Sequence, residues 1–291
     1  MVVLADREPL TDHQLLAGNL SFKPFDLVSA EWDSLITDCD VIHHYAWSTL
    51  PQTANENPVA DFSTNVGSTL SLLEAMRRCG GKRLIFASSG GTVYGKLRQV
   101  PVPEDHPLNP VTAYGVSKMV AEKYMGLYRE LYGLDCRVAR LSNPFGAGQN
   151  PKRQQGAVTT FLHKALAREK ITIWGNGEVV RDYIHISDVT RALVALASTN
   201  LNHVPDLPVF NIGSGQGTSL NQLIKAIETH LDRHITVEYE ASRPFDIPVN
   251  ILDVTRADEV LGWRCALSLA DGIHIATGDM RGRNTAYSSL A

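Results

Sequence analysis

Short apolar runs alternate with longer amphipathic segments along this chain, and the alternation restricts its fold more than any other feature. Buried strands are predicted for five apolar runs, which are Val2–Ala5, Leu20–Phe25, Val41–Tyr45, Arg83–Ser88 and Cys136–Leu141. Helical periodicity covers Asn65–Arg78 and Ala113–Tyr132. Because strands that alternate with helices pair in parallel through crossover connections, the predicted fold class is α/β, a doubly wound parallel sheet.

The second half of the chain contains more turn residues. Gly, Pro and Asn gather in Asn143–Pro151 and Trp174–Glu178, which predicts loops there. A strand at Pro208–Ile212, a helix at Ser219–Leu231 and a strand at Ile235–Tyr239 are expected after them. The last dozen residues are polar and contain glycine, so they are expected to form a loosely held tail.

Composition excludes several classes of function. The chain has 27 Lys and Arg against 31 Asp and Glu, a net charge of −4, and no long block of like charge, which argues against a nucleic-acid or anionic-membrane binder. No apolar stretch reaches the ~18 residues needed to span a bilayer. The four cysteines are far apart in the sequence, so neither a zinc site nor a disulfide framework is expected. We expect a cytoplasmic protein with reduced thiols.

The most informative motif heads the second predicted helix. Thr112–Lys118 reads Thr-Ala-Tyr-Gly-Val-Ser-Lys and follows the strand-end segment Phe86–Gly95, which contains Ser-Ser-Gly-Gly-Thr-Val-Tyr-Gly. Tyr114 and Lys118 are four residues apart and therefore share a helix face. A nearby ammonium favours the phenolate, so the pKa of Tyr114 is expected to fall from about 10 towards neutrality, making it a proton acceptor.

These motifs, in this order, give the chain its resemblance to a family. From Val2 to about Ile273 it resembles the extended short-chain dehydrogenase/reductases of the NAD-dependent epimerase/dehydratase family, most of all their UDP-glucose 4-epimerases. The remaining markers of that family are Arg140–Gly146, Arg181–Asp188, and Arg243 with Asp246 ahead of Leu261–Trp263.

The resemblance implies two domains and a homodimer. Residues 1–145 correspond to a Rossmann-type NAD-binding domain, which takes back about residues 181–213. Residues 146–180 and 214–291 correspond to a smaller α/β domain that binds a nucleotide-sugar. In the family, the two helices predicted at Asn65–Arg78 and Ala113–Tyr132 form a bundle with a second copy.

Carried over residue by residue, the family's catalytic triad falls on Ser89, Tyr114 and Lys118. Counting forward along the strand selects Ser89, whereas counting back from Val93 reaches a glycine, because the segment has one residue more than the common version. Ser88 is the alternative for the triad serine, and otherwise a strand residue bonded to backbone.

The resemblance also implies which residues contact NAD: Asp6, Arg7, Asp26, Leu27, Tyr45, Ala46 and Asn65, together with Tyr114 and Lys118. A carboxylate at Asp6 accepts hydrogen bonds from ribose hydroxyls and repels a 2′-phosphate, which favours NAD over NADP. Arg7 can accommodate that phosphate, so NADP stays open. Without the family context, Asp6 reads as a solvated strand-end acid.

One family feature is not found in the printed sequence. No Gly-x-x-Gly-x-x-Gly turn, which lets the backbone approach the pyrophosphate at a helix N-terminus, precedes Asp6. We therefore expect either a sequence truncated by one βα unit, roughly 25–30 residues, or a variant with impaired cofactor binding.

The nucleotide-sugar side rests on two arginines and their neighbours. The planar guanidinium groups of Arg181 and Arg243 match the oxygens of a diphosphate. In the family, these positions hold the pyrophosphate, Asp246 binds the ribose, Asn143 contacts the sugar diphosphate and Ser89 the sugar. The plainer alternatives are an ion pair for Arg181 and a turn acid at Asp246.

The reaction expected from the resemblance is inversion at C4 of a UDP-hexose through a 4-keto intermediate. Sugar 4,6-dehydratases of the family carry Asp-Glu beside the catalytic residue, where this chain has Gly90-Gly91. Two alternatives remain: an NAD(P)-dependent nucleotide-sugar reductase or decarboxylase, and a catalytically silent nucleotide-sugar-binding protein.

Overall fold

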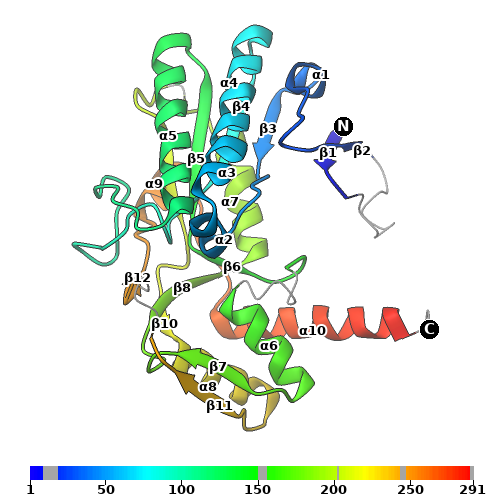
Figure 1. The fold of residues 1–291 in the computed structure, drawn as a ribbon, viewed down its shortest axis with the longest axis vertical. Helices are drawn as coiled ribbons and strands as arrows, with labels where there is room; N and C mark the ends of the chain where they lie inside the picture. The colour runs from blue at the N-terminus through cyan, green and yellow to red at the C-terminus, as the bar shows by residue number, and fades with distance from the viewer. Residues whose placement is uncertain (9–18, 150–155, 202, 243–246, 289–291) are drawn as a thin grey trace. The chain divides into compact units, whose positions relative to one another are not determined.

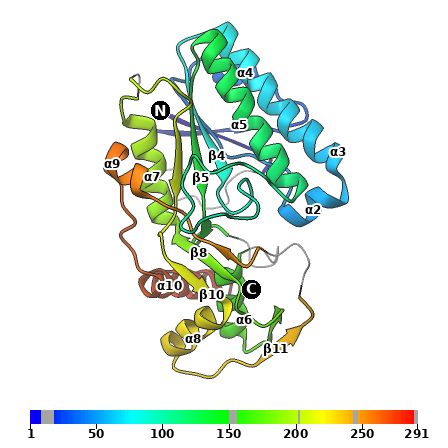
Figure 2. The same cartoon turned by 90° about the vertical axis from the view of Figure 1, so that its left-hand side faces the viewer.

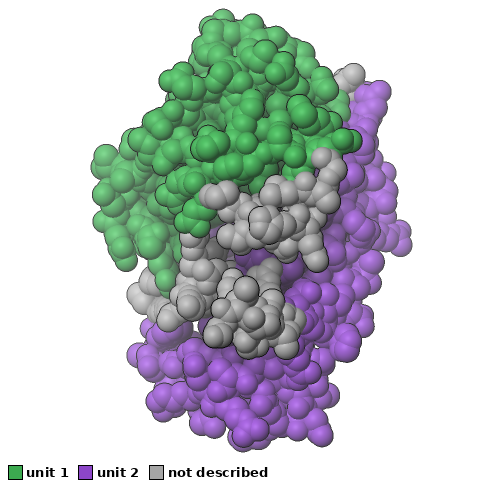
Figure 3. All heavy atoms as spheres, turned by 90° about the vertical axis from the view of Figure 1, so that its right-hand side faces the viewer, with its two compact units in different colours: residues 1–86, 112–137 green, residues 87–111, 138–291 purple. Residues whose placement is uncertain are grey.

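A computed structural model describes residues 1–8, 19–149, 156–201, 203–242 and 247–288 of the chain. The chain divides into two compact units (Figure 3). Unit 1 contains Met1–Phe86 and Thr112–Arg137, and unit 2 contains Ala87–Val111 and Val138–Ala291. The division into a cofactor domain and a nucleotide-sugar domain at the boundaries given above stays a prediction.

A parallel sheet forms the centre of the α/β fold. Its strands, in spatial order, are β3 (Val41–His44), β4 (Arg83–Ser89), β5 (Asp135–Leu141) and β9 (Val209–Ile212). Val41 lies opposite Arg83, and Val138 lies opposite Val209, both in parallel register. Consecutive residues of β4, such as Leu84–Phe86, are fully buried, whereas buried and exposed residues would alternate in a strand with one face in solvent. Burial on both faces is typical of parallel sheets. The predicted α/β fold class is confirmed.

Unit 1 also contains a second, smaller sheet and the helices of the N-terminal half. Strands β1 (Val2–Asp6) and β2 (Leu20–Pro24) pair in parallel with each other. The helices are α1 (Trp32–Ile36), α2 (Pro51–Glu56), α3 (Pro58–Asp61), the π-helical turn η2 (Phe62–Val66), α4 (Gly67–Cys79) and α5 (Ala113–Tyr132). Helices α4 and α5 lie side by side in both views (Figure 1, Figure 2).

Helix α5 has the bounds that the sequence predicts, and local chemistry explains both ends. The Thr112 side chain accepts a hydrogen bond from the Gly115 N–H at 3.2 Å, which satisfies one unpaired donor of the first turn. Gly133 ends the helix with φ of 67°, a left-handed conformation that glycine adopts without a steric penalty. The position of α5 is therefore set by residues on either side of the Tyr-x-x-x-Lys motif.

Unit 2 contains a mixed sheet and a parallel strand pair. In the mixed sheet, β8 (Val180–His185) pairs in parallel with β6 (Asn143–Phe145) and β12 (Val249–Asn250) and antiparallel with β10 (Gly217–Ser219). The pair is β7 (Ile171–Trp174) with β11 (Val237–Glu240). The helices are α6 (Ala157–Ala167), α7 (Ile186–Ser198), α8 (Leu220–Leu231), α9 (Thr255–Leu261) and α10 (Leu269–Ser288).

The core of this half lies between three of those helices and the strands. Phe145, Leu162, Ile171, Leu223 and Ile273 belong to one buried apolar cluster, contributed by β6, α6, β7, α8 and α10. The expected polar tail is wrong as far as Ser288, because α10 continues to that residue. No helix in the described part of the chain is long and apolar enough to cross a membrane.

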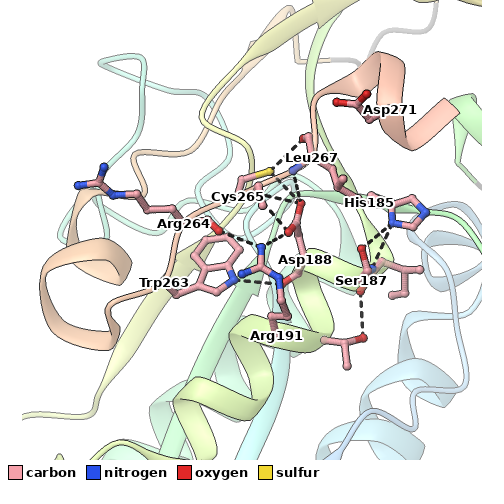
Figure 4. Close-up of polar contacts among 12 residues, drawn as sticks. His185, Ser187, Asp188, Arg191, Trp263, Arg264, Cys265, Leu267 and Asp271 are labelled. Carbon is pink, nitrogen blue, oxygen red and sulfur yellow. Dashed lines mark hydrogen bonds and ion pairs between the residues drawn. The ribbon is translucent and has the colours of Figure 1, made fainter. Parts of the chain in front are cut away.

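A buried carboxylate attaches the start of α7 to the segment before α10 (Figure 4). Asp188, 1% exposed, accepts hydrogen bonds from the N–H groups of Ala266 and Leu267 at 3.2 and 3.0 Å. The Cys265 thiol donates to it at 3.2 Å, and Arg191 forms an ion pair with it. Burial works to raise the pKa of Asp188, but these donors outweigh it and hold the pKa below its ordinary value.

The Asp188→Asn substitution should therefore destabilise the protein in a pH-dependent way. A carboxyl with a lowered folded-state pKa contributes stability above its unfolded pKa and loses that contribution as the pH falls. At pH 7 we expect a loss of about 1–3 kcal/mol in the free energy of unfolding, measured in urea. The difference from the unsubstituted protein should shrink below the ordinary pKa of 3.8.

The control is Asp258→Asn, which removes an exposed ion pair with Arg264. We expect its effect to stay below about 1 kcal/mol, as for other surface pairs. An Asp188→Asn protein as stable as the control variant at pH 7 would contradict the role assigned to Asp188.

Candidate active site

The structure brings Tyr114 and Lys118 together in the first two turns of α5. Lys118 is only 3% exposed, and its Nζ lies 3.7 Å from the centre of the Trp47 ring. The ring centres of Phe86 and Tyr114 lie 4.6 and 5.7 Å from the same nitrogen. The cation is thus enclosed by aromatic faces, whose negative quadrupoles attract it.

The ionisation of this pair differs from the sequence-based expectation. Burial, assisted by the negative charge of Asp61, raises the pKa of Tyr114 to about 12, so the expected fall towards neutrality is wrong for this structure. Burial lowers the pKa of Lys118 to about 7, although Glu122 and Asp61 act in the opposite direction. Desolvation outweighs the mutual attraction, and at neutral pH the tyrosine keeps its proton while the lysine is about half protonated.

Asn65, predicted to contact NAD, has a different set of partners in the structure. It is 1% exposed, and its Oδ1 accepts from the N–H and the hydroxyl of Ser48 at 2.8 and 3.0 Å. Its Nδ2 donates to Thr49 Oγ1 at 3.2 Å and to Asp61 Oδ1 at 2.9 Å. These four hydrogen bonds use the full capacity of an amide. Asn65 therefore fixes the loop after β3, and its contact with NAD stays a prediction.

Of the two histidines at the end of β3, one is buried and the other is exposed. His44 is buried, and its Nε2 lies 3.2 Å from Thr69 Oγ1. Burial and the charge of Lys118 lower the pKa of His44 to about 3, so it is neutral at pH 7. His43 Nδ1 lies 2.6 Å from the hydroxyl of Tyr45, which is 49% exposed and precedes Ala46. No group of three or more His, Cys, Asp or Glu side chains in the described residues is placed to hold a metal ion.

The predicted strand-end carboxylates lie at one edge of the β1–β2 pair. Asp6 ends β1, Asp26 follows β2, and parallel pairing puts both strand ends at the same edge. Both carboxylates are exposed and accept hydrogen bonds from nearby main-chain N–H groups, as Asp26 does from Val28 at 2.8 Å. Their neighbours Arg7 and Leu27 are exposed and half-buried, respectively.

These residues fit a dinucleotide. The exposed carboxylate of Asp6 is an acceptor that ribose hydroxyls can use, that of Asp26 is an acceptor for the adenine, and the buried Lys118 carries donor N–H groups. Trp47 Nε1 is buried and has no hydrogen-bond partner among the described residues, so unit 1 contains a donor suited to an acceptor from outside the chain.

The candidate serines end β4, where unit 2 begins. Ser88 is 4% exposed, whereas Ser89 is half-buried, and its carbonyl accepts from the N–H of Val93 at 3.1 Å to form a turn. The next residue, Gly90, leaves no room for a side chain, since a Cβ there would lie 2.7 Å from a methyl group of Leu252. Ser89 is thus the more exposed of the two residues, and its assignment to the triad stays a prediction.

A buried network that the sequence analysis missed fixes the loop after Ser89. The Tyr94 hydroxyl donates to Asn211 Oδ1 at 2.6 Å and accepts from Arg140 Nη1 at 2.9 Å. Arg140 also donates to the Glu104 carbonyl at 2.9 Å. The tyrosine of Thr-Val-Tyr-Gly was the only sign of this network in the sequence. Its partners could not be identified there, because Arg140 lies 46 residues and Asn211 117 residues along the chain.

On the substrate side, main-chain carbonyls hold the predicted residues Asn143 and Arg181. Asn143 Nδ2 donates to the Asp182 carbonyl at 2.9 Å, and Arg181 Nη1 donates to the carbonyl of Ile247 at 2.6 Å. The Asp182 carboxylate accepts from Ser214 and Gly215. The predicted residues Arg243 and Asp246 lie outside the described residues.

A parallel α/β sheet with acidic strand ends and a helix that carries Tyr-x-x-x-Lys defines a Rossmann-type, dinucleotide-dependent class of protein. The family model "NAD dependent epimerase/dehydratase family" matches residues 2–213, and the chain belongs to that family. This confirms the family that the motifs indicated.

Individual relatives agree with this assignment. A UDP-glucose 4-epimerase of Mycolicibacterium smegmatis is 35% identical over 88% of this chain and 82% of its own. A dTDP-4-dehydro-6-deoxyglucose reductase of Escherichia coli is 36% identical over 79% and 71%. The structure of UDP-glucose 4-epimerase from Thermotoga maritima with UDP-glucose aligns with a TM-score of 0.87 and 30% identity over 97% and 91% of the two chains.

The buried Lys118 should make folding stability depend on pH in a defined window. Its folded-state pKa of about 7 lies below the ordinary 10.5, so the native state gains stability as the pH rises between these values. We expect Lys118→Met to stabilise the protein most at pH 7 and below, with the gain gone above pH 10.5, as measured by urea unfolding.

Lys123→Met is the matched control, since Lys123 is an exposed lysine of the same helix. Its effect should be small and independent of pH over this window. A Lys118→Met effect equal at pH 7 and pH 10 would show that Lys118 does not titrate near neutrality.

Proposed function

We propose that this protein is an NAD-dependent nucleotide-sugar 4-epimerase that inverts C4 of a UDP-hexose through a 4-keto sugar. The observation that carries the proposal is the pair formed by the buried Lys118 and the half-buried Tyr114 at the start of α5. Membership of the NAD dependent epimerase/dehydratase family and the epimerase names of its relatives support the reaction and the UDP-sugar class.

NAD, when bound, supplies the acceptor that takes a hydride from C4 and returns it. Asp6 would bind the adenosine ribose, with Arg7 beside it. Asp26 and Leu27 would contact the adenine, and Tyr45 and Ala46 would approach the phosphates and ribose of the cofactor. Lys118 would donate to the nicotinamide ribose, because its ammonium offers three donors and no acceptor. The observation that fits this assignment is the exposed carboxylate pair at one edge of β1–β2.

Tyr114 is the group proposed to move the C4 hydroxyl proton. With a tyrosine pKa of about 12 and a lysine pKa of about 7, the favoured form near neutral pH is phenol with amine. The form with phenolate and ammonium has the same total charge, and it contains the base that removes a proton from the sugar. Ser89 orients the sugar hydroxyl by hydrogen bonding to it.

The nucleotide part of the substrate is assigned to the second unit. Arg181 and Arg243 would bind the diphosphate, Asp246 the ribose of the nucleotide, and Asn143 the sugar diphosphate. Hydrogen bonds to main-chain carbonyls hold both side chains in place. Arg181 donates to the carbonyl of Ile247, and Asn143 donates to that of Asp182.

A second candidate is a nucleotide-sugar reductase that releases its cofactor after each turnover. The 36% identity to a dTDP-4-dehydro-6-deoxyglucose reductase of Escherichia coli favours it. The two functions differ in stoichiometry, because an epimerase needs no added NAD(P)H and a reductase consumes one per product. A rate that depends on added NADPH would favour the reductase.

Tyr114→Phe should abolish C4 inversion, because it removes the only hydroxyl of the pair and leaves the ring. We expect a loss of at least about 100-fold in kcat, the size typical of general acid–base groups. The measurement is interconversion of UDP-glucose and UDP-galactose by the purified protein. Retained turnover in a folded Tyr114→Phe protein would exclude this mechanism.

The serines provide an internal comparison. Ser89→Ala should lower kcat, whereas Ser88→Ala, which alters a buried strand residue, should change stability more than kcat. The opposite pattern would reassign the triad serine to Ser88.

We also propose that the protein is cytoplasmic. The free thiols of all four cysteines support a reducing compartment.

A homodimer formed through α4 and α5 is proposed as well. Several apolar side chains of α5 are 40–58% exposed, namely Val116, Leu127, Leu131 and Tyr132. Leu131→Glu should convert the dimer to a monomer in sedimentation velocity, and a monomeric unsubstituted protein would contradict the proposal.

A further inference from the structure

A fully buried carboxylate lies beside the catalytic pair in unit 1. Asp61, the last residue of α3, is 0% exposed and accepts hydrogen bonds from Asn65 and Ser117. Burial of a carboxylate carries a desolvation cost that hydrogen bonds offset only in part, so a charged residue here calls for a role beyond packing.

We infer that Asp61 is a positioning residue for Tyr114 and Lys118: its carboxylate fixes the first turns of α5 through Ser117 and places a negative charge beside the pair. This inference rests on the proposed function, in which that pair moves the proton of the sugar hydroxyl. Asp61 itself touches neither the sugar nor the reacting atoms.

The geometry of the carboxylate connects three segments. Oδ2 accepts from the Ser117 hydroxyl at 2.5 Å, and Ser117 immediately precedes Lys118 on α5. Oδ1 accepts from Asn65 Nδ2 at 2.9 Å and from the Thr49 hydroxyl. One side chain therefore links the loop after β3, the turn η2 and the start of α5. Because the donors hold both oxygens, the carboxylate cannot rotate away from the pair.

Among the described charged groups near the pair, Asp61 is the one that affects the pKa of both Tyr114 and Lys118. Glu122, one turn beyond Lys118 on α5, acts on Lys118, and His44 from β3 is neutral. Asp61 acts on both members of the pair, raising the pKa of Tyr114 and opposing the fall in that of Lys118. Its charge therefore keeps the phenol and the ammonium protonated to higher pH than burial alone would allow.

Asp61→Asn tests this inference, because the amide keeps the shape and removes the charge. Loss of the negative charge lowers both pKa values, so both limbs of the pH profile of kcat/KM should move to lower pH, by about one unit. Ser117→Ala is the matched variant, since it removes a hydrogen bond and keeps the charge. It should lower kcat while both limbs stay in place.

A readout independent of turnover separates the inference from the proposed function. The ¹⁵Nζ signal of Lys118, assigned by its loss in Lys118→Met, should titrate at a pH about one unit lower in Asp61→Asn than in the unsubstituted protein. An unchanged titration in folded Asp61→Asn overturns the inference. If the unsubstituted protein inverts no sugar, the proposed function fails, and the Lys118 titration still decides the role of Asp61.

Ser117→Ala supplies a second measurement in case Asp61→Asn does not fold. It removes the hydrogen bond from α5 to Asp61 Oδ2 and keeps the charge, so it should lower kcat without moving the Lys118 titration. An unchanged kcat in folded Ser117→Ala would overturn the positioning of α5 by Asp61.

Discussion

Desolvation of one ammonium group governs this active site. Lys118 is enclosed by the rings of Trp47, Phe86 and Tyr114, so water cannot solvate its charge. Burial of that kind lowers the pKa of a lysine and raises that of a tyrosine. The pKa of Lys118 is about 7 and that of Tyr114 about 12 as a result. Burial and the charge of Lys118 also lower the pKa of His44 to about 3, so this histidine is neutral at pH 7.

Buried aspartates recur in both units as acceptors for loops. Asp61 is bonded to Ser117, Asp182 to the Ser214–Gly215 turn and Asp188 to the segment before α10. A carboxylate offers about four acceptor sites, more than any neutral side chain, so it can satisfy several N–H and hydroxyl donors of a loop at once. Two residues proposed to act in the site are neighbours of these contacts along the chain, since Lys118 follows Ser117 and Arg181 precedes Asp182.

Much of the fold could be predicted from the sequence, because hydrophobic periodicity is a local property. Helix α5 has the predicted bounds, and the strand predicted at Arg83–Ser88 is one residue longer in the structure. The partners of Asp61 and Tyr94 could not be predicted, since they come from segments far apart along the chain. The predicted fall in the pKa of Tyr114 was wrong for a related reason. The motif indicates that an ammonium group is near the tyrosine, but how deeply the tyrosine is buried depends on packing by distant segments.

The saturated amide of Asn65 has a consequence for sequence variation. Its two oxygen lone pairs and two N–H groups are all used, two bonds on each side. Aspartate lacks the donors, leucine lacks both functions, and glutamine is one methylene too long for the same four partners. Position 65 is therefore expected to tolerate no other residue type, and a natural variant here would have to change Ser48, Thr49 and Asp61 at the same time.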